Sequence, residues 1–175
     1  TSAEVEYLNG AVGKDKLSAW TANIAFAGFT APKLLWMRKN EPENFARIAK
    51  IMLPKDYINY VLTGVHCCDY SDASGMLLLD VEHKCWSKEM HDILGIDLSK
   101  RAKIVKEPGK VVGHIGKEVS ERSGLPVGTP ICMGAHDQNC CTFGAGAVDD
   151  GTAVLVMGTF GSCFVVSDKS IRDPK

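Results

Sequence analysis

The stretch TPICMGAHDQNCCTFGAG, from Thr129 to Gly146, constrains the fold more than any other part of the sequence. An apolar run ends abruptly at Asp137, and small residues that can continue as a helix follow it. Composition predicts a buried strand over 129–135 and a helix over 138–147. A strand that turns tightly into a helix is the unit of open α/β sheets, and ligands collect at such turns. We therefore expect an α/β fold with Asp137 at a strand-to-helix junction.

Helical patterning divided by prolines fills the stretch from Ala31 to Gly64. A proline is tolerated in the first turn of a helix, because its missing N–H group would have no partner there. The apolar spacing predicts three helices, which begin near Pro32, Pro42 and Pro54, and the last of them ends at Gly64. In the second helix, the residues expected to face inward are Phe45, Ile48 and Ala49.

Strand-like segments join the helical ones further along the chain. A helix introduced by Ser87 and closed by Gly95 precedes a predicted strand over 111–114. Two apolar runs, over 153–157 and 163–167, are joined across the letters GTFG and predict a β-hairpin. A lone hairpin is only marginally stable, so we expect the chain to be a fragment that continues beyond it.

Charge and hydropathy exclude several classes of protein. Lys and Arg number 20 and Asp and Glu number 21, which gives a net charge of −1. Proteins that bind duplex nucleic acid usually carry a basic stripe, and the sequence has none. No apolar run approaches the roughly 18 residues that a membrane-spanning helix needs, and the first residues do not resemble a signal peptide. We therefore expect a soluble protein that binds neither nucleic acid nor a membrane.

The cysteines point to a reducing compartment. Their number is seven, which is odd, and no CxxC pair occurs. Free thiols in the cytoplasm fit this pattern better than a disulfide framework. Histidine and cysteine neighbour each other at His66 and Cys67 and lie close at His136 and Cys140, but zinc sites prefer spacings that let two ligands converge. We predict no metal site in the chain and interpret the thiols as small buried hydrophobic groups.

Asp137 is the first candidate for chemistry. N–H groups at the start of the following helix would keep its carboxylate ionised despite partial burial, so that it could act as a base. A simpler role is that of the helix N-cap, since caps are far commoner than catalytic bases. The residues alone leave both interpretations open.

Two further segments carry polar groups that could bind a ligand. Gly158 and Gly161 flank Thr159, and a tight turn with bare N–H groups can cradle a phosphate, although a plain hairpin turn also demands glycine. In the segment DYSDAS, Tyr70 offers a ring for stacking on a sugar and a hydroxyl for its oxygens. Local turn and capping roles explain the polar residues of that segment equally well.

Four motifs together resemble the FGGY family of carbohydrate kinases. They are GFTAPKLLWMRKNEPENFARIAKIMLPKDYINYVLTG, DYSDASGMLLLDVEHKCWS, LPVGTPICMGAHDQ and VLVMGTFG, and they follow the order of the family over nearly the whole chain. The xylulokinase-like branch is the most similar. The resemblance implies a ribonuclease H-like fold of the actin and hexokinase type, incomplete here, with a mixed sheet and flanking helices. It also implies that residues 1–145 are the second half of a sugar-binding domain and that 146–175 open an ATP-binding domain with its first hairpin.

The resemblance implies roles for the candidate residues. Asp137 matches the catalytic base of the family and contacts the substrate, Gln138 matches a polyol-contacting position, and Tyr70 falls where the glycerol-kinase branch uses a tyrosine against its substrate. The residues that match the phosphate-binding loop are Gly158, Thr159 and Gly161. The implied cofactors are ATP and Mg²⁺, and the implied partner is a small sugar or polyol. Whether the protein forms a homodimer is a question that the resemblance leaves open.

The implied reaction is transfer of the γ-phosphoryl group of ATP to a sugar hydroxyl. Asp137 would orient that hydroxyl and accept its proton, while Mg²⁺ and the Thr159 loop hold the developing charge. The chain alone is expected to be an inactive fragment, because the family's amino-terminal phosphate loop and its adenine pocket are missing from it. The alternative is a non-catalytic sugar-binding or assembly module that retains half of the kinase fold.

Overall fold

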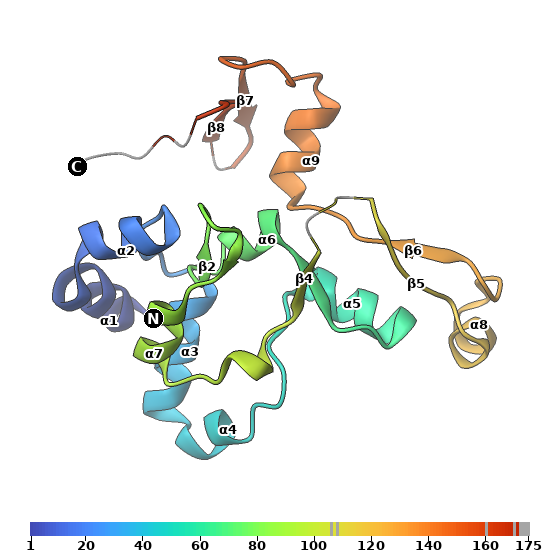
Figure 1. Cartoon of the computed structure of the whole chain (residues 1–175), viewed down its shortest axis with the longest axis horizontal. Coiled ribbons are helices and arrows are strands. Elements are labelled where there is room, and N and C mark those ends of the chain that lie inside the picture. Colours follow the sequence, from blue (N-terminus) through green and yellow to red (C-terminus); the bar gives the residue numbers. More distant parts are fainter. Residues whose placement is uncertain (106, 108, 160, 170, 172–175) are drawn as a thin grey trace. The chain divides into compact units, whose positions relative to one another are not determined.

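The computed structural model describes the whole chain except residues 106, 108, 160, 170 and 172–175 (Figure 1). It divides the chain into two compact units, Thr1–Gly134 and Ala135–Lys175, and each unit is described by itself. Among the described residues, none of the helices combines the length and the apolar content that a membrane span requires.

The first unit holds most of the helices. Its helical elements in chain order are α1 (Ser2–Glu6), η1 (Tyr7–Gly13, a π-helix), α2 (Lys14–Thr21), α3 (Thr30–Asn40), α4 (Pro42–Ala46), α5 (Pro54–Thr63), α6 (Tyr70–Ser74), α7 (Lys88–Leu94), η2 (Leu98–Lys100, a 3₁₀ turn) and α8 (Lys117–Ser123). The three helices predicted between Ala31 and Gly64 are confirmed as α3, α4 and α5. Gly64 closes α5 with φ at +73°, a left-handed conformation that glycine adopts without strain.

Helix α4 is shorter than the sequence pattern predicts. The N–H groups of Arg47 and Ile48 donate to carbonyls three residues back, those of Asn44 and Phe45, at 3.1 and 3.2 Å. This 3₁₀-type tightening ends the helix at Ala46. Phe45 and Ile48 are half-buried as expected, but the inward position predicted for Ala49 is wrong, because that residue lies beyond the helix and is exposed.

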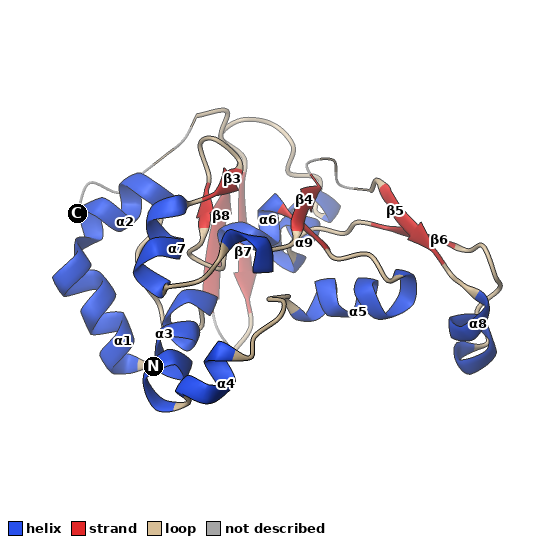
Figure 2. Ribbon diagram, turned by 60° about the horizontal axis from the view of Figure 1, so that its bottom comes forward, coloured by secondary structure: helices blue, strands red, loops and turns tan. Residues whose placement is uncertain are grey.

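The strands are short and pair two by two (Figure 2). In the first unit they are β1 (Cys67–Asp69), β2 (Leu79–Asp80), β3 (Cys85–Trp86), β4 (Lys103–Val105), β5 (Val111–His114) and β6 (Pro130–Cys132). Among the described residues, β1 pairs with β4 in parallel, whereas β2 with β3 and β5 with β6 are antiparallel. Strands of both directions are therefore present with helices around them, but among the described residues they form separate two-stranded ladders instead of the one mixed sheet predicted.

Strand β6 corrects a second prediction. The sequence predicts a buried strand over 129–135, but the strand comprises three residues, and Pro130 and Cys132 are exposed. Strand β6 pairs only with β5 among the described residues, and this two-stranded ladder leaves much of its surface uncovered. Burial returns at Met133, directly after the strand.

Helix α5 and strand β5 approach each other very closely. A methyl group added at Gly113 in β5 would lie 2.6 Å from Cβ of Thr63, the last residue of α5. Figures 1 and 2 both show α8 at the far end of the β5 and β6 ladder. The ladder therefore packs against α5, and α8 lies at the end of the ladder that points away from the middle of the unit.

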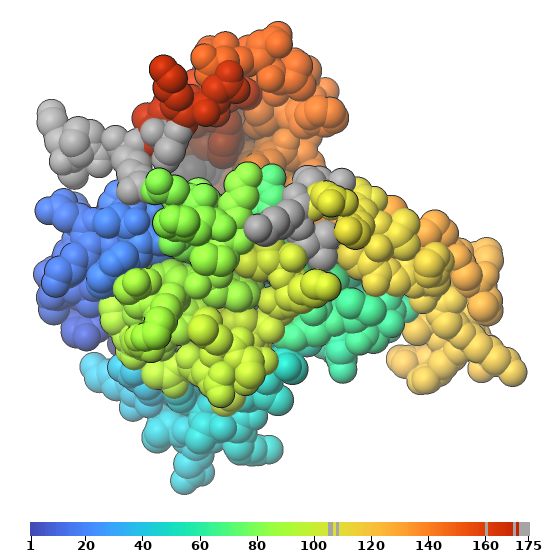
Figure 3. Space-filling model, viewed as in Figure 1, coloured from blue at the N-terminus to red at the C-terminus, as the bar shows by residue number. Residues whose placement is uncertain are grey.

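One hydrophobic core holds the first unit together. The apolar run from Met76 to Leu79 is almost fully buried and forms its centre. Leu8 of η1 and Leu17 of α2 belong to the same cluster, and the space-filling view shows the amino-terminal helices, in blue, against the green segment that contains this run (Figure 3). Burial of side chains of this size contributes about 1.5 to 3 kcal/mol each.

Helix α5 turns a polar face inward. Asp56 and Asn59 are buried, whereas Ile58 and Val61 are 55% and 45% exposed. An ordinary amphipathic helix buries its apolar stripe. The inner face of α5 is therefore stabilised by ion pairs and hydrogen bonds rather than by apolar contacts.

A buried histidine and a buried arginine hold α7 to the chain that follows it. The His91 ring donates from Nδ1 to the carbonyl of Ser87 at 2.6 Å and accepts at Nε2 from Nε of Arg101, also at 2.6 Å. The guanidinium carbon of Arg101 lies 5.5 Å from the centre of the Trp86 ring, a cation–π contact. Burial lowers the pKa of Arg101 to about 10, so it stays charged at neutral pH. Burial, together with this neighbouring charge, lowers the pKa of His91 as well.

The second unit consists of one helix and one hairpin. Helix α9 spans Asp137–Gly144, and strands β7 (Ala153–Met157) and β8 (Gly161–Val165) pair antiparallel with Met157 opposite Gly161. The predicted helix and hairpin are thus confirmed. Strand β8 begins two residues earlier than expected, so Gly161 belongs to the strand rather than to the turn.

The buried His91 predicts a pH-dependent stability. Because its pKa is lower in the folded than in the unfolded chain, the unfolded chain binds the extra proton first as the pH falls. Stability should be complete above about pH 6.5, the ordinary value for histidine, and should decline between that pH and the lower pKa of the folded state. Thermal unfolding from pH 8 to pH 5 measures this loss.

A glutamine variant isolates the effect of this ring. His91→Gln can keep an acceptor for Arg101 but cannot titrate, so it should flatten the decline. The matched control His83→Gln removes an exposed histidine and should leave the decline in place. An unchanged slope in His91→Gln would contradict the assignment.

Candidate functional site

Asp137 is the first residue of α9, next to the end of β6 in the chain. The predicted strand-to-helix junction is confirmed. The predicted alternative that Asp137 is the helix N-cap is wrong, because His136 occupies the cap position. The partial burial expected for Asp137 is also wrong, since its side chain is 78% exposed. The described residues therefore leave this carboxylate open to a ligand from solvent.

Hydrogen-bond donors lie close to the Asp137 carboxylate. Its Oδ1 accepts the backbone N–H of Gln138 at 2.8 Å and lies 3.5 Å from Nδ1 of His136. The first turn of a helix also presents the positive end of the helix dipole. Its Oδ2 lies 3.5 Å from the side-chain amide of Gln138. The structure therefore brings together two of the predicted substrate-binding residues, with one carboxylate edge facing solvent.

The glycine-flanked turn joins β7 to β8. Gly158 and Thr159 are exposed in this turn, and Gly161 opens β8 with open space where a side chain would extend. Phe160 lies outside the described residues. Exposed backbone in a tight turn can donate to an anion, so the arrangement is compatible with the predicted phosphate contact.

Tyr70 lies in the first unit, at the first position of α6. Its ring is half-buried against the hydrophobic core, and the ammonium group of Lys84 lies 5.1 Å from the ring centre. Asp69 is the N-cap of this helix and accepts the backbone N–H groups of Ser71 and Asp72 at 2.9 and 3.1 Å. The Ser71 hydroxyl also donates to Asp69. The capping role that the sequence allowed within this segment therefore belongs to Asp69.

Lys55 is the polar residue that the sequence reasoning missed. Its ammonium group lies 3.0 Å from Asp56, 2.8 Å from Asp69 and 3.5 Å from Asp72. The signal that could have revealed it is the pair of polar residues, Asp56 and Asn59, spaced to share one face of α5.

The charges of this cluster reinforce one another. Burial alone would lower the pKa of Lys55, but hydrogen bonds and charges from Asp69 and Asp56 outweigh burial and raise it. Burial alone would raise the pKa of Asp69, but hydrogen bonds from Lys55, Ser71 and the Asp72 backbone outweigh it and hold that pKa below its usual range. Both groups are therefore charged at neutral pH.

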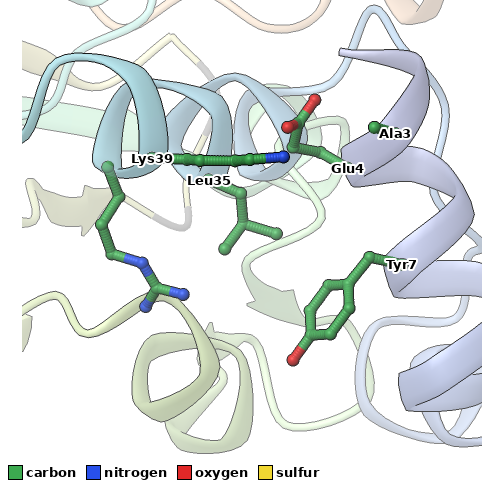
Figure 4. A pocket seen from close by; sticks show the side chains of 6 residues that line it. Ala3, Glu4, Tyr7, Leu35 and Lys39 are labelled. Carbon is green, nitrogen blue, oxygen red and sulfur yellow. The ribbon is translucent and has the colours of Figure 1, made fainter.

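A separate hollow lies between α1 and α3. Figure 4 shows Tyr7 and Leu35 on its walls, with Glu4 and Lys39 at one side. Its volume is about 290 Å³, and none of the predicted site residues lines it. The hollow is therefore distinct from the groups that carry the predicted chemistry.

The sequence matches a known family over most of its length. A profile of the FGGY family of carbohydrate kinases, N-terminal domain, matches residues 1–144. The chain belongs to this FGGY family. The resemblance seen in the four motifs is thereby confirmed.

Relatives within the family are known kinases. A xylulose kinase of Escherichia coli (strain K12) is 38% identical over 156 residues, which cover 89% of this chain and 32% of that protein. The crystal structure of a xylulose kinase from Rhodospirillum rubrum is similar with a TM-score of 0.88 and 29% identity, covering 98% of this chain and 35% of that one. A gluconate kinase from Lactobacillus acidophilus has a TM-score of 0.86 and 28% identity, covering 93% and 33%.

These likenesses define the fold of the FGGY chain. They confirm the predicted actin- and hexokinase-type α/β architecture, present here in part. The chain spans about a third of the length of the relatives it matches.

The capping carboxylate of α6 gives a prediction for stability. Asp69→Ala should lower the free energy of unfolding by about 3 to 5 kcal/mol, because it removes the cap of α6 and leaves the Lys55 ammonium group without its nearest partner. Urea unfolding followed by circular dichroism measures the loss. Asp97→Ala is the matched control, since Asp97 caps the exposed turn η2 and should matter much less. Equal losses of unfolding free energy in the two variants would contradict the proposed contribution of the Lys55–Asp69 ion pair to stability.

Proposed function

We propose that this FGGY chain is part of an ATP-dependent carbohydrate kinase that phosphorylates a hydroxyl group of a xylulose-like ketose or a polyol. The observation that carries the proposal is the exposed Asp137 carboxylate at the start of α9, beside Gln138, in a member of a carbohydrate kinase family. Several relatives named xylulose kinase support the substrate class. We place the enzyme in the cytoplasm.

Asp137 acts as the general base in this proposal. A sugar hydroxyl is a poor nucleophile until a positioned group accepts its proton. One edge of the Asp137 carboxylate is held by the Gln138 N–H, which fixes the orientation of the group, and the exposed oxygen can accept the proton. The Gln138 amide beside it can hydrogen-bond a second hydroxyl of the substrate. In the first unit, Tyr70 is proposed as a further substrate-contacting residue.

The turn between β7 and β8 takes the phosphate end of ATP. Backbone N–H groups around Gly158 and Gly161 and the hydroxyl of Thr159 are suitable donors to phosphate oxygens. Among the described residues, no three His, Cys, Asp or Glu side chains gather as a metal-binding cluster. This donor set fits Mg²⁺ that arrives with the nucleotide, because Mg²⁺ commonly takes one or two carboxylates together with phosphates and waters. When bound, it would neutralise charge on the transferred phosphoryl group.

The domain boundary follows the same proposal. Residues 1–145 form the second half of the sugar-binding domain, and 146–175 form the opening hairpin of the ATP-binding domain. The end of the family match at residue 144 supports this division.

A substrate screen separates the kinase from the alternative, a non-catalytic sugar-binding or assembly module. The full-length protein is offered ketoses, aldonates and polyols, and ADP release is followed in a coupled assay. Similarity to both a xylulose kinase and a gluconate kinase is the reason to include aldonates. Sugar-dependent ADP release supports the kinase, whereas sugar binding without ADP release favours the module.

Replacement of the proposed base tests its role directly. Asp137→Asn in the full-length protein should lower kcat by about 10²-fold or more, because proton transfer by a positioned side chain contributes at least that factor. The KM for the sugar should change little, since the amide keeps the shape and one acceptor. Asp149→Asn, an exposed neighbour in the same unit, is the control. Near-normal turnover in Asp137→Asn would remove the assigned base.

The turn gives a second kinetic prediction. Thr159→Val keeps the shape of the side chain but removes the donor to phosphate, so kcat/KM for ATP should fall about tenfold, the size of one hydrogen bond to a charged group. Thr152→Val, at the other end of the hairpin, should leave this constant unchanged. If both variants keep the wild-type value, Thr159 does not contact the nucleotide.

A further inference from the structure

One ammonium group links three segments of the first unit. Lys55 lies in the first turn of α5. Its partners are Asp56 on the same helix, Asp69 at the end of β1 and Asp72 in α6. The side chains of Asp56 and Asp69 are 1% and 2% exposed, whereas that of Lys55 is 26% exposed. A single positive charge therefore faces three negative ones in a mostly buried space. Without it, the like charges would repel one another with little screening by water.

The first link leads to Tyr70. Asp69 uses one carboxylate oxygen to cap α6 and the other to meet Lys55 at 2.8 Å. Tyr70 follows Asp69 directly and has its backbone fixed by the same cap. The ammonium group of Lys55 therefore controls the orientation of the capping carboxylate. Through this cap it also controls the backbone conformation at Tyr70, which sets the direction of the Tyr70 side chain.

The second link leads to Met133 and Gly134, the two residues directly after β6. The Lys55 ammonium group donates to the sulfur of Met133 at 3.5 Å, and Asn59 reaches the same sulfur at 4.0 Å. Cδ of Lys55 lies only 3.4 Å from where a methyl group at Gly134 would be. Lys55 thus anchors the Met133–Gly134 backbone directly after β6.

We propose that Lys55 is a positioning residue for sugar binding, which holds the cap of α6 under Tyr70 and the Met133–Gly134 segment of the first unit in one fixed arrangement. The inference rests on the proposed function, because Tyr70 is one of its substrate-binding residues. Lys55 itself acts through these segments and does not take part in the chemistry. Small displacements of groups that orient a substrate are enough to lower enzyme efficiency strongly.

The central experiment compares two lysine variants of the full-length protein. Lys55→Met keeps a long unbranched side chain and removes its charge, and it should raise the KM for the sugar about tenfold or more while the KM for ATP stays within about twofold. Lys88→Met is the matched control, since Lys88 forms an exposed ion pair with Asp92 at 2.6 Å and should leave both constants unchanged. Lys55→Arg keeps the charge and should restore the sugar KM most of the way toward the wild-type value.

A double-mutant cycle identifies the contact responsible. Asp69→Asn should raise the sugar KM in the same direction as Lys55→Met, and the double variant should be no worse than the poorer single one, because both changes remove the same ion pair. Additive effects would contradict a shared route. If Lys55→Met does not fold, Asp72→Asn removes a partly exposed partner instead and should raise the sugar KM by a smaller factor in the same direction.

Hydrogen exchange tests the positioning without any activity. The amides of Ser71 and Asp72, which donate to Asp69, should exchange about tenfold faster or more in Lys55→Met, while amides of α8 keep their protection. Unchanged exchange in α6 would overturn the positioning role.

The outcomes for the two proposals are distinguishable. A wild-type protein that phosphorylates sugars, combined with an unchanged sugar KM in Lys55→Met, overturns the role of Lys55 and leaves the proposed function intact. A lowered unfolding midpoint with unchanged kinetic constants would likewise reduce Lys55 to a stabilising residue. A wild-type protein that neither binds nor phosphorylates any sugar in calorimetry and the coupled assay overturns the proposed function, and the sugar-binding part of this inference with it.

Discussion

The ion pair between Lys55 and Asp69 is the interaction on which the rest of the first unit depends. A buried carboxylate is costly unless it is paired and hydrogen-bonded, and Asp69 meets both conditions through Lys55, Ser71 and the backbone of α6. This pair explains why α5 turns its polar side inward, a choice that would otherwise cost apolar burial. It also explains how α6, a helix of only five residues, keeps a defined start.

The local pattern of the sequence predicts helices and turns well where capping residues define them. Pro54 and Gly64 delimit α5, and the hairpin of β7 and β8 follows from its glycine-flanked turn. These signals act within a few residues, so they survive in almost any tertiary setting. Among the candidate site residues, the neighbouring pair of Asp137 and Gln138 could be predicted for the same reason, because adjacent positions at a helix start fix each other.

The rest depends on contacts between distant segments. The exposure of Asp137 could not be predicted, because burial is set by what covers a residue and not by the apolar run that precedes it. The exposure of most of β6 has the same cause. Lys55 was missed because a lysine beside an aspartate is typical of a solvated surface. Only the approach of β1 and α6 makes it the centre of a partly buried charge cluster. The FGGY resemblance identified the family from its motifs, but the motifs do not reveal which side chains elsewhere in the chain hold the motif residues in place.

The junction of α5 and β5 sets a strict geometric condition. Position 113 has no room for a Cβ atom, because the side chain of Thr63 occupies the space that it would fill. The Gly113 backbone of β5 is therefore in direct contact with the Thr63 side chain at the end of the helix that carries Lys55. A bulkier residue at position 113 would force α5 and β5 apart and, with them, shift the helix on which the Lys55 charge cluster is built.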